Sequence, residues 1–375
     1  MALPLRVIQS IRPQASPGVI AGAALVAAVF ATTPFLVPDV SSQLEVPLGA
    51  TGLISTAQVA SFALASFLAG RFLRPRRRFH YGGIVLLAGS CVASAVMPTF
   101  GLLVATRAVA GIGLGTLTWI AWADATRFPR GIGEVAAIAP ITAAITSPVI
   151  AWLIARDGYQ WAFVALAVLA LVTLVFRVDF ADLPRIGRTV SRSRSNRLLL
   201  LALLLLTVGG SGVFVFAAAT GIGYVGISPV NVAWALSLNA LAGVLGTRLD
   251  AKPKTAGLWL LGAALPALAL GNVAHHLAFF AAMALWGFCF WVVIPAAFRL
   301  LAEKSLAATE RIGDAQALMA VGRVFGPVIG GAAIVGERYG RLSVVGAAFM
   351  FIAAAIIGGI EIGRARGVGG SRHIQ

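Results

Sequence analysis

Twelve long apolar segments, separated by short polar connections, run through almost the whole chain. Each is about 20 residues long, which is the length that an α-helix needs to cross the hydrocarbon core of a membrane. Twelve such helices would use roughly 240 residues, which leaves about ten for each connection and no room for a separate soluble domain. We expect the segments at about residues 17–37, 49–72, 80–98, 100–124, 131–154, 160–177, 198–222, 229–248, 255–272, 275–299, 312–335 and 342–363.

The composition favours membrane helices over a soluble fold. Hydrophobic residues make up 59% of the 375 residues, charged residues make up 11%, and the mean hydropathy is +0.93. A soluble domain is about 25% charged, so we exclude a soluble enzyme, a TIM barrel, a doubly wound sheet and a disordered chain. The two cysteines, Cys91 and Cys289, lie inside apolar segments and form neither a disulfide framework nor a metal-ligand pattern.

Basic residues alternate between the two ends of the expected helices. The chain has 29 Lys and Arg against 13 Asp and Glu, which gives a net charge of +16. With a cytoplasmic N-terminus, 24 basic residues fall on the cytoplasmic side and three, Arg156, Arg338 and Arg341, fall on the other. Such a bias orients membrane proteins, so it predicts an even number of helices, cytoplasmic N- and C-termini and a place in the cytoplasmic (inner) membrane. Because the basic residues form short clusters between apolar segments, we expect no nucleic-acid partner.

The chain divides into two similar halves around its longest connection. Residues 177–197 are polar and basic, contain proline and serine, and follow the sixth apolar segment. AGRFLRPRRR at 69–78 resembles LGTRLDAKPK at 245–254, and SPVIAWL at 147–153 resembles GPVIGGA at 326–332. Repeats of this kind, with an even number of helices in each, occur in transporters.

These patterns predict an all-α membrane protein. Its twelve transmembrane helices would form two six-helix bundles related by a pseudo-two-fold axis. The expected parts are a first bundle at 1–178, a cytoplasmic linker at 179–197 and a second bundle at 198–375.

Short motifs in both halves resemble signatures of the major facilitator superfamily. After its second helix that family carries a glycine, an aspartate four residues later, and then basic residues. Here Gly70 is followed by Arg74 and further arginines, so an arginine replaces the aspartate. At the equivalent place in the second half, Gly246 and Asp250 keep the family pattern.

Two further motifs carry the same resemblance, which covers essentially the whole chain. On the fourth helix, Arg107 precedes three alternating glycines at Gly111, Gly113 and Gly115. The pattern GxxxGPxxGG, found on the fifth helix of many exporters of the family, stands here on the eleventh helix. Its residues are Gly322, Gly326, Pro327, Gly330 and Gly331.

The resemblance implies a secondary active transporter and not an enzyme. Two bundles would rock about a central cavity that the first, fourth, seventh and tenth helices line, and would expose it to each side in turn. The chain lacks the GxxxxGK[ST] motif of ATP-binding loops, so coupling to an ion gradient, expected to be protons, or facilitated diffusion is predicted. A membrane-embedded enzyme would need paired acids or metal ligands within the helices, and the sequence shows none.

Direction and substrate stay open at this point. The exporter-type glycine pattern favours export of a small organic solute. No Asp or Glu stands in the middle of an apolar segment, which favours an anionic or neutral substrate, so an uptake permease for a small organic anion is the alternative. A non-transporting sensor or scaffold is a third hypothesis. We expect no cofactor and no metal, partners limited to the solute, protons and the bilayer, and a monomer.

Arg107 is the sharpest candidate for a substrate or coupling residue. A charge in the middle of a membrane helix costs about 2.5–3.5 kcal/mol on insertion scales, so it should face protein or water and have a partner. A contact with an anionic substrate and a purely structural role are both open, and Asp39 is the acid expected nearest in depth. Further candidates for the cavity are Thr33, Gln58, Trp119, Asn239, Trp286 and Trp291.

A second group of candidates belongs to the cytoplasmic gate. In the family, the aspartate after the second helix engages the inner end of the eleventh helix. The replacement by arginine predicts a reversed pair, with Arg71 or Arg74 facing Asp314 or Glu310, while Asp250 would keep the usual role against the fifth helix. Helix packing and hinge roles are expected for Gly111, Gly115, Pro148, Gly322, Arg323, Gly326, Pro327 and Gly330.

Overall fold

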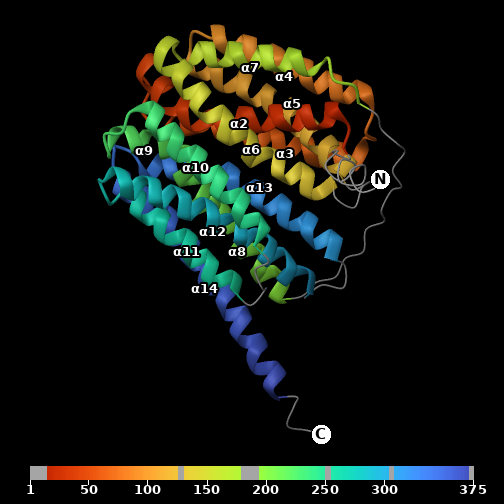
Figure 1. The fold of residues 1–375 in the computed structure, drawn as a ribbon, viewed down its shortest axis with the longest axis vertical. Coiled ribbons are helices and arrows are strands. Elements are labelled where there is room, and N and C mark those ends of the chain that lie inside the picture. The colour runs from red at the N-terminus through yellow and green to blue at the C-terminus, as the bar shows by residue number, and fades with distance from the viewer. Residues whose placement is uncertain (1–14, 126–130, 179–193, 250–254, 304–307, 371–375) are drawn as a thin grey trace, which may run out of the picture.

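The computed structural model is built of helices joined by short connections (Figure 1). It describes residues 15–125, 131–178, 194–249, 255–303 and 308–370, which form thirteen α-helices and no strand. Ten of these helices are long and apolar enough to cross a membrane, and two more, Tyr159–Thr173 and Ala256–Leu270, are apolar but shorter. The chain is therefore an all-helical, multi-pass membrane protein, as the sequence predicts.

The helices of the first half lie close to the predicted segments. They form the upper bundle in Figure 1, coloured red to yellow. They are α2 (Pro17–Gln43), α3 (Gly52–Phe72), α4 (Arg77–Val96), α5 (Phe100–Ala125), α6 (Gly131–Asp157) and α7 (Tyr159–Thr173).

The second half contains one helix more than predicted. The segment expected as a single helix at 198–222 is divided at Phe216, which lies outside helical geometry (φ −98°, ψ 8°). The shorter piece packs across onto α2 of the first bundle, a tertiary contact that the local sequence does not reveal. The helices are α8 (Arg194–Val215), α9 (Ala217–Gly223), α10 (Pro229–Arg248), α11 (Ala256–Leu270), α12 (His276–Glu303), α13 (Ala308–Ala333) and α14 (Tyr339–Gly370).

The two ends of the helices differ in character. We call one the basic end, because the exposed Arg71, Arg74, Arg77, Arg177 and Arg248 lie there. The other, the short-loop end, carries the brief connections 44–51, 97–99, 158, 224–228, 271–275 and 334–338.

Local chemistry fixes two helix starts at the short-loop end. The hydroxyl of Ser228 accepts a hydrogen bond from Asn231 N (3.4 Å), and Pro229 occupies the first turn of α10, where a missing N–H costs nothing. Gly158 has φ +85°, a value that side chains other than glycine rarely adopt, and this allows α6 to turn directly into α7. Helices of opposite direction are therefore joined with almost no intervening chain.

The packing pattern of the first bundle is repeated in the second. Within the first, α2 packs on α6 and α7, α3 packs on α5, and α4 packs on α5 and α7. Within the second, α8 packs on α13 and α14, α10 packs on α12, and α11 packs on α12 and α14. Between the two bundles, α3 packs on α13 and α6 packs on α10, and these two contacts are equivalent under the same correspondence of helices. This correspondence is the predicted pseudo-two-fold symmetry of two bundles.

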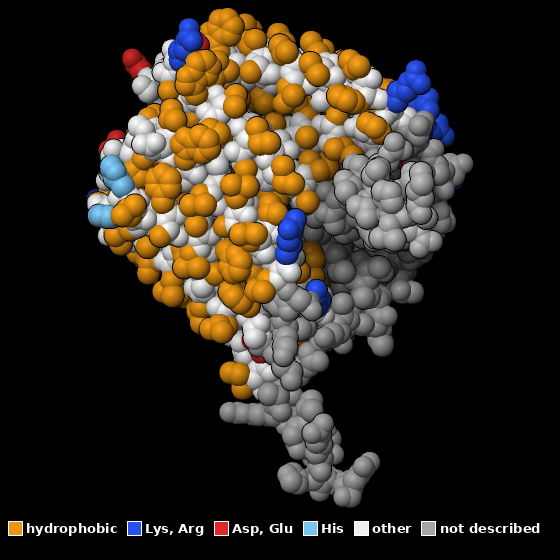
Figure 2. Space-filling view, viewed as in Figure 1, with side chains coloured by type: hydrophobic (Ala, Val, Ile, Leu, Met, Phe, Trp, Pro, Cys, Tyr) orange, Lys and Arg blue, Asp and Glu red, His pale blue; other side chains and the backbone are white. Residues whose placement is uncertain are grey.

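The outer surface is that of a membrane protein. Hydrophobic side chains cover the visible sides of both bundles, and most Lys and Arg side chains lie at the margins (Figure 2). Large apolar side chains such as Ile145 (66% exposed), Leu258 (67%) and Leu277 (74%) would be costly in water. A lipid environment removes that cost, so this surface faces the hydrocarbon core.

Candidate functional site

The two bundles are closed against each other near the short-loop end. Gly49 and Gly331 bring the backbones of the α2–α3 connection and α13 into direct contact, and a Cβ atom on either would overlap the other's carbonyl oxygen. Thr56 Oγ1 donates a hydrogen bond to Val324 O (3.2 Å) between α3 and α13. On the symmetry-related side, Ser237 Oγ donates to Ala144 O (2.8 Å) between α10 and α6.

An apolar cluster supports this closure. Val37 of α2 packs with residues of the second bundle, and Phe216, at the break between α8 and α9, is completely buried. A Cβ atom on Gly52 would lie 3.0 Å from the Phe216 ring, so α3 also lies against this residue. The other buried members are Val215, Ala219, Ala333, Ile334, Tyr339 and Leu342. The cluster therefore fills the space between the bundles at the short-loop end.

Towards the basic end the same helix faces are uncovered. Phe67 lies eleven residues after Thr56, on the same face of α3 and about 16 Å further along, and it is 56% exposed. Leu241, one turn after Ser237 on α10, is 51% exposed. We call the region between the bundles on this side the interbundle space. The hydrogen bonds between the bundles thus lie towards the short-loop end, and Phe67 and Leu241 beyond them are exposed.

Arg323 of α13 lies next to the closed region. It stands between Gly322, which packs against Thr207 of α8, and Val324, whose carbonyl bonds to α3. Its side chain is exposed, whereas its neighbours Gly322 and Gly326 are buried. The sequence assigned Arg323 to helix packing; the structure places it between two helices of different bundles.

Arg107 of α5 is entirely buried inside the first bundle. Its guanidinium lies 4.6 Å from the centre of the Phe163 ring of α7, and Nη2 lies 3.7 Å from Cys91 Sγ of α4. Its Nε and Nη1 have no hydrogen-bond partner among the described residues. The cation–π contact, worth about 2 kcal/mol or more when desolvated, is the main interaction that stabilises this charge.

Asp39 lies at the short-loop end of α2, away from the contacts of Arg107. Its Oδ2 accepts hydrogen bonds from Tyr159 N (2.8 Å) and from Gln43 Nε2 (2.8 Å). The carboxylate thus caps the N-terminus of α7, where a negative charge is stabilised by the exposed N–H groups. The structure does not bring Asp39 and Arg107 together.

The remaining cavity candidates of the first bundle lie at helix contacts. Thr33 is buried, with its hydroxyl 3.5 Å from Val29 O, one turn earlier on its own helix. Gln58 is buried where α3 meets α5, and Trp119 lies 3.6 Å from the Cβ position of Gly70. Among the described residues, none of these three side chains contacts Arg323.

The candidates of the second bundle pack between its own helices. Asn239 Nδ2 donates to Met283 O of α12 (2.8 Å). Trp286 is buried and makes an edge-to-face contact with Phe214 of α8, while Trp291 fills the space beside Gly243 of α10. Their positions stabilise the packing of α12 on α8 and α10.

The motif glycines lie where helices approach most closely. Cβ atoms on Gly111 and Gly115 would overlap backbone atoms of α3, and those on Gly322, Gly326 and Gly330 would overlap or crowd α8. Pro327 is buried, and its carbonyl lies 2.7 Å from the Cβ position of Gly52 on α3. Pro148 lies inside α6 and is partly buried. A hinge at either proline stays a prediction.

The structure describes the side chains of only one half of the predicted gate, the arginines of the first bundle. Arg71 and Arg74 are exposed at the basic end, and Arg71 lies 5.8 Å from the Phe72 ring. Asp250 lies outside the described residues. Glu310 and Asp314 belong to α13, but their side chains also lie outside the described part. The reversed pair therefore stays a prediction.

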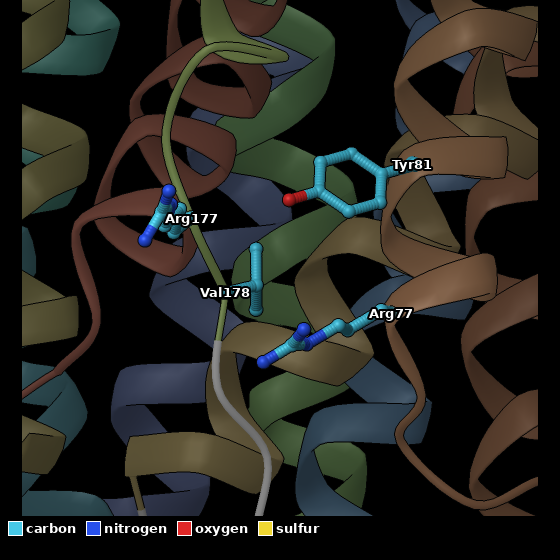
Figure 3. Close-up of a pocket in the computed structure, with 4 residues that line it drawn as sticks. All are labelled: Arg77, Tyr81, Arg177 and Val178. Atoms are coloured by element: carbon cyan, nitrogen blue, oxygen red, sulfur yellow. The ribbon is translucent and has the colours of Figure 1, made fainter.

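A cavity lies at the basic end of the first bundle, between the start of α4 and the chain that follows α7. It has a volume of about 420 Å³ and is lined by Arg77, Tyr81, Arg177 and Val178. Figure 3 shows the guanidinium groups of Arg177 and Arg77 on opposite sides of Val178, with the Tyr81 ring above Arg77. The sequence treated these arginines as topology charge. Their position at the ends of the third and sixth helices was the signal that they would meet.

The described residues contain no group of His, Cys, Asp and Glu that could hold a metal ion. The arrangement instead offers two similar bundles, a closed end, an uncovered end and an arginine at the boundary. Such a geometry can admit a solute from one side of a membrane while blocking the other.

The comparisons agree with this arrangement. The family model of the Major Facilitator Superfamily matches residues 19–331. The chain therefore belongs to this superfamily, and it is a membrane transporter for a small molecule and not an enzyme. No curated protein matches the chain.

Solved structures of transporters share the fold. A bacterial homologue of the human lysosomal transporter Spinster, in an inward-facing and occupied conformation, aligns with a TM-score of 0.71 at 15% identity, over 90% of this chain and 94% of that one. Its inward-facing, unoccupied form gives 0.70 at 13% identity, over 92% and 96%. The nucleoside transporter NupG gives 0.69 at 11% identity, over 91% and 98%. At these identities the similarity shows the fold alone.

Proposed function

We propose that the protein is a secondary active transporter that moves a small organic solute across the cytoplasmic membrane by alternating access. The observation that carries this proposal is the closure of the two bundles at one end and the uncovered helix faces at the other. Because the bundles have equivalent packing, rocking one against the other exchanges the closed end for the open one. The solute is exposed to each side in turn.

The basic end is cytoplasmic in this proposal, and so are both termini. The support is the excess of Lys and Arg in the connections on that side. The structure then corresponds to an inward-facing state of a monomer, with bundles at 1–178 and 198–375 and a linker at 179–197. The thiol of an Arg338→Cys variant should react with an impermeant reagent added to intact cells, and that of an Arg248→Cys variant should not. The reverse pattern would refute the orientation.

Two directions of transport are supported by different residues. The glycine pattern of α13 is typical of exporters, and it supports proton-coupled export. The lack of any Asp or Glu in the middle of an apolar segment supports the second candidate, an uptake permease for a small organic anion. Such a permease needs no central carboxylate.

Flux through reconstituted protein tests the proposal. Liposomes containing the protein are offered labelled organic anions, organic cations and uncharged solutes, with and without an imposed pH gradient. We expect saturable uptake of at least one class. Accumulation that collapses with the pH gradient would support proton coupling, and its direction relative to the gradient separates export from uptake.

A cross-linked variant supplies the matched control. Thr56→Cys and Val324→Cys, joined through two disulfides by a short bis-methanethiosulfonate reagent, would hold the short-loop end closed. Flux should stop in the cross-linked protein and return after reduction, while either single cysteine should transport normally. Absence of saturable flux in all three classes, or full flux with the cross-link in place, would contradict alternating access.

A further inference from the structure

Arg323 is a charged residue deep inside a membrane-spanning helix. It lies ten residues before the end of α13 at Ala333, which places it about 15 Å from the short-loop end. The apolar span Ala315–Ala333 surrounds it in the sequence. A guanidinium at this depth is costly unless it faces water or a partner charge.

The faces of α13 show in which direction Arg323 projects. Val321, Phe325 and Val328 are 40%, 54% and 43% exposed, and they form the lipid-facing side. At about 100° per residue, Arg323 lies between 140° and 200° around the helix from each of them. Gly322, at 100° on the other side, faces α8. Arg323 is therefore directed away from lipid and between the two bundles.

The side chain of Arg323 is exposed although protein surrounds it. Its side chain is exposed, although the residues on either side of it, Gly322 and Val324, contact α8 and α3. A group that is both enclosed and exposed faces an internal space. Among the described residues it makes no hydrogen bond, ion pair or ring contact. Arg107, in contrast, is completely buried against Phe163.

A second exposed polar residue lies between Arg323 and the basic end. Gln316 lies seven residues earlier, almost directly below Arg323 on the same face and about 10 Å nearer the basic end. It too is exposed. The two polar side chains mark a path along α13 that water and small solutes can follow.

In the described part of the chain, no acidic residue balances this charge from the middle of a helix. Asp39 caps α7, Asp124 is the next-to-last residue of α5, and Glu361 accepts a hydrogen bond from Gly257 N at the far end of the apolar part of α14. An uncompensated guanidinium in a space with low-dielectric walls attracts anions. Its planar fork matches carboxylate, sulfonate and phosphate groups.

We propose that Arg323 binds the anionic group of the transported solute in the interbundle space, and that the substrate class is the small organic anions. This inference rests on the proposed transport function and gives it a substrate class. The charge of the solute replaces the missing carboxylate, so the bound complex is close to neutral. The remainder of the solute lies along the uncovered apolar faces, such as that of Phe67 on α3.

The test uses a charged probe and needs no transport. Gln316→Cys is introduced into the otherwise native protein, since Cys91 and Cys289 are buried. The purified protein reacts in turn with an anionic ethylsulfonate and a cationic ethyltrimethylammonium methanethiosulfonate reagent. The readout is the ratio of the two rates at about 0.01 M salt, where the Debye length of about 30 Å exceeds the distance to Arg323.

We expect the anionic reagent to be favoured when Arg323 is present. Arg323→Gln should reduce the ratio by about five- to tenfold, within the range of electrostatic steering. Arg323→Lys should keep most of it. Arg338→Gln removes the same charge at the short-loop end and should leave the ratio unchanged. The difference should shrink as salt is raised.

Three outcomes overturn the proposal. The first is an equal ratio with Arg323 and with Gln at this position, and the second is an equal reduction by Arg338→Gln. Failure of the Gln316→Cys variant to react with either reagent, in protein that elutes as a single folded species, would show that the path is not open. Loss of flux without loss of the ratio would count against the transport function and not against the anion site, so the two failures are distinguishable.

Discussion

Arg107 and Arg323 are two arginines deep inside membrane helices, one in each bundle, and they have opposite surroundings. Arg107 is completely buried between α4 and α7. Arg323 is exposed between α13 and the other bundle. The same side chain thus serves as a packed core residue in one place and as an accessible charge in the other. The difference shows that depth in the membrane alone does not define the role of a charged residue.

The spacing between each arginine and its glycines explains the difference. Gly111 and Gly115 follow Arg107 by four and eight residues, which is a rotation of only about 40° and 80°. The glycines face α3, so Arg107 is turned into the same bundle. Gly322 precedes Arg323 by one residue, a rotation of about 100°. Because Gly322 faces α8, Arg323 is turned away from its own bundle.

The largest effect is expected from breaking the contact that orients Arg323. Gly326→Val would place side-chain atoms inside Ser211 and the backbone of α8. Overpacking against backbone should cost about 3 kcal/mol or more, and the variant should lose its monodisperse peak in size-exclusion chromatography. Gly89→Val is the matched control, because nothing lies within 4 Å of its Cβ position. Equal behaviour of the two variants would contradict the close α8–α13 packing.

A smaller effect should separate the two arginines by stability. Arg107→Ala removes the contact with Phe163 and leaves a cavity, so unfolding free energy should fall by about 2–4 kcal/mol. Arg323→Ala removes an exposed side chain and should change it by about 0.5 kcal/mol or less. Melting temperatures of the two purified variants give the answer. A larger loss for Arg323→Ala would reverse the assigned roles.

Flux measurements sharpen the comparison for Arg107 itself. Methionine is apolar and of similar length, and replacing a buried charge by a well-packed apolar residue is often neutral or stabilising. If Arg107 only packs against Phe163, as its contacts suggest, Arg107→Met should keep its flux within about twofold of the native protein. A folded Arg107→Met protein without flux would instead support a role of Arg107 in substrate binding or coupling. Arg107→Lys should then fail as well, because lysine lacks the guanidinium fork.

The smallest effect is expected at the predicted gate, where exposed arginines meet solvent. A pair between Arg74 and Asp314 would be worth about 1 kcal/mol or less, enough to shift a two-state equilibrium several-fold. Arg74→Asp or Asp314→Arg alone should increase labelling of a Gln316→Cys reporter in the interbundle space. The double reversal should restore the original labelling. Simple addition of the two single effects would contradict the pair and leave Asp314 as a helix cap.

The sequence determined the fold class, the helix positions and the repeat. Pro229–Arg248 coincides with the predicted 229–248, and Phe100–Ala125 with 100–124. This success has a physical reason. Each crossing of a bilayer requires about 20 apolar residues, and every backbone hydrogen bond must be made within the helix because the hydrocarbon core offers no partner. The positions of the helices can therefore be predicted from hydropathy alone.

The tertiary structure decided how the candidate residues are used. The sequence placed Asp39 at the outer end of the first helix. Only the packing of α6 and α7 beside α2 showed that its carboxylate caps the N-terminus of α7 at Tyr159. The division at Phe216 is likewise accompanied by a contact of α9 with α2 of the other bundle. In both cases the deciding partner lies far away in the chain, and local propensity carries no information about it.

The two arginines show the same limit of prediction from the sequence. The sequence identified both as charges within membrane helices, because hydropathy exposes any charge in an apolar run. It could not tell a guanidinium packed against Phe163 from one that faces an open space. That distinction depends on which neighbouring helices cover each face, and helix packing depends on contacts across the whole molecule. The periodicity of one helix shows in which direction each side chain projects. Only the assembled bundles show whether protein, lipid or open space lies in that direction.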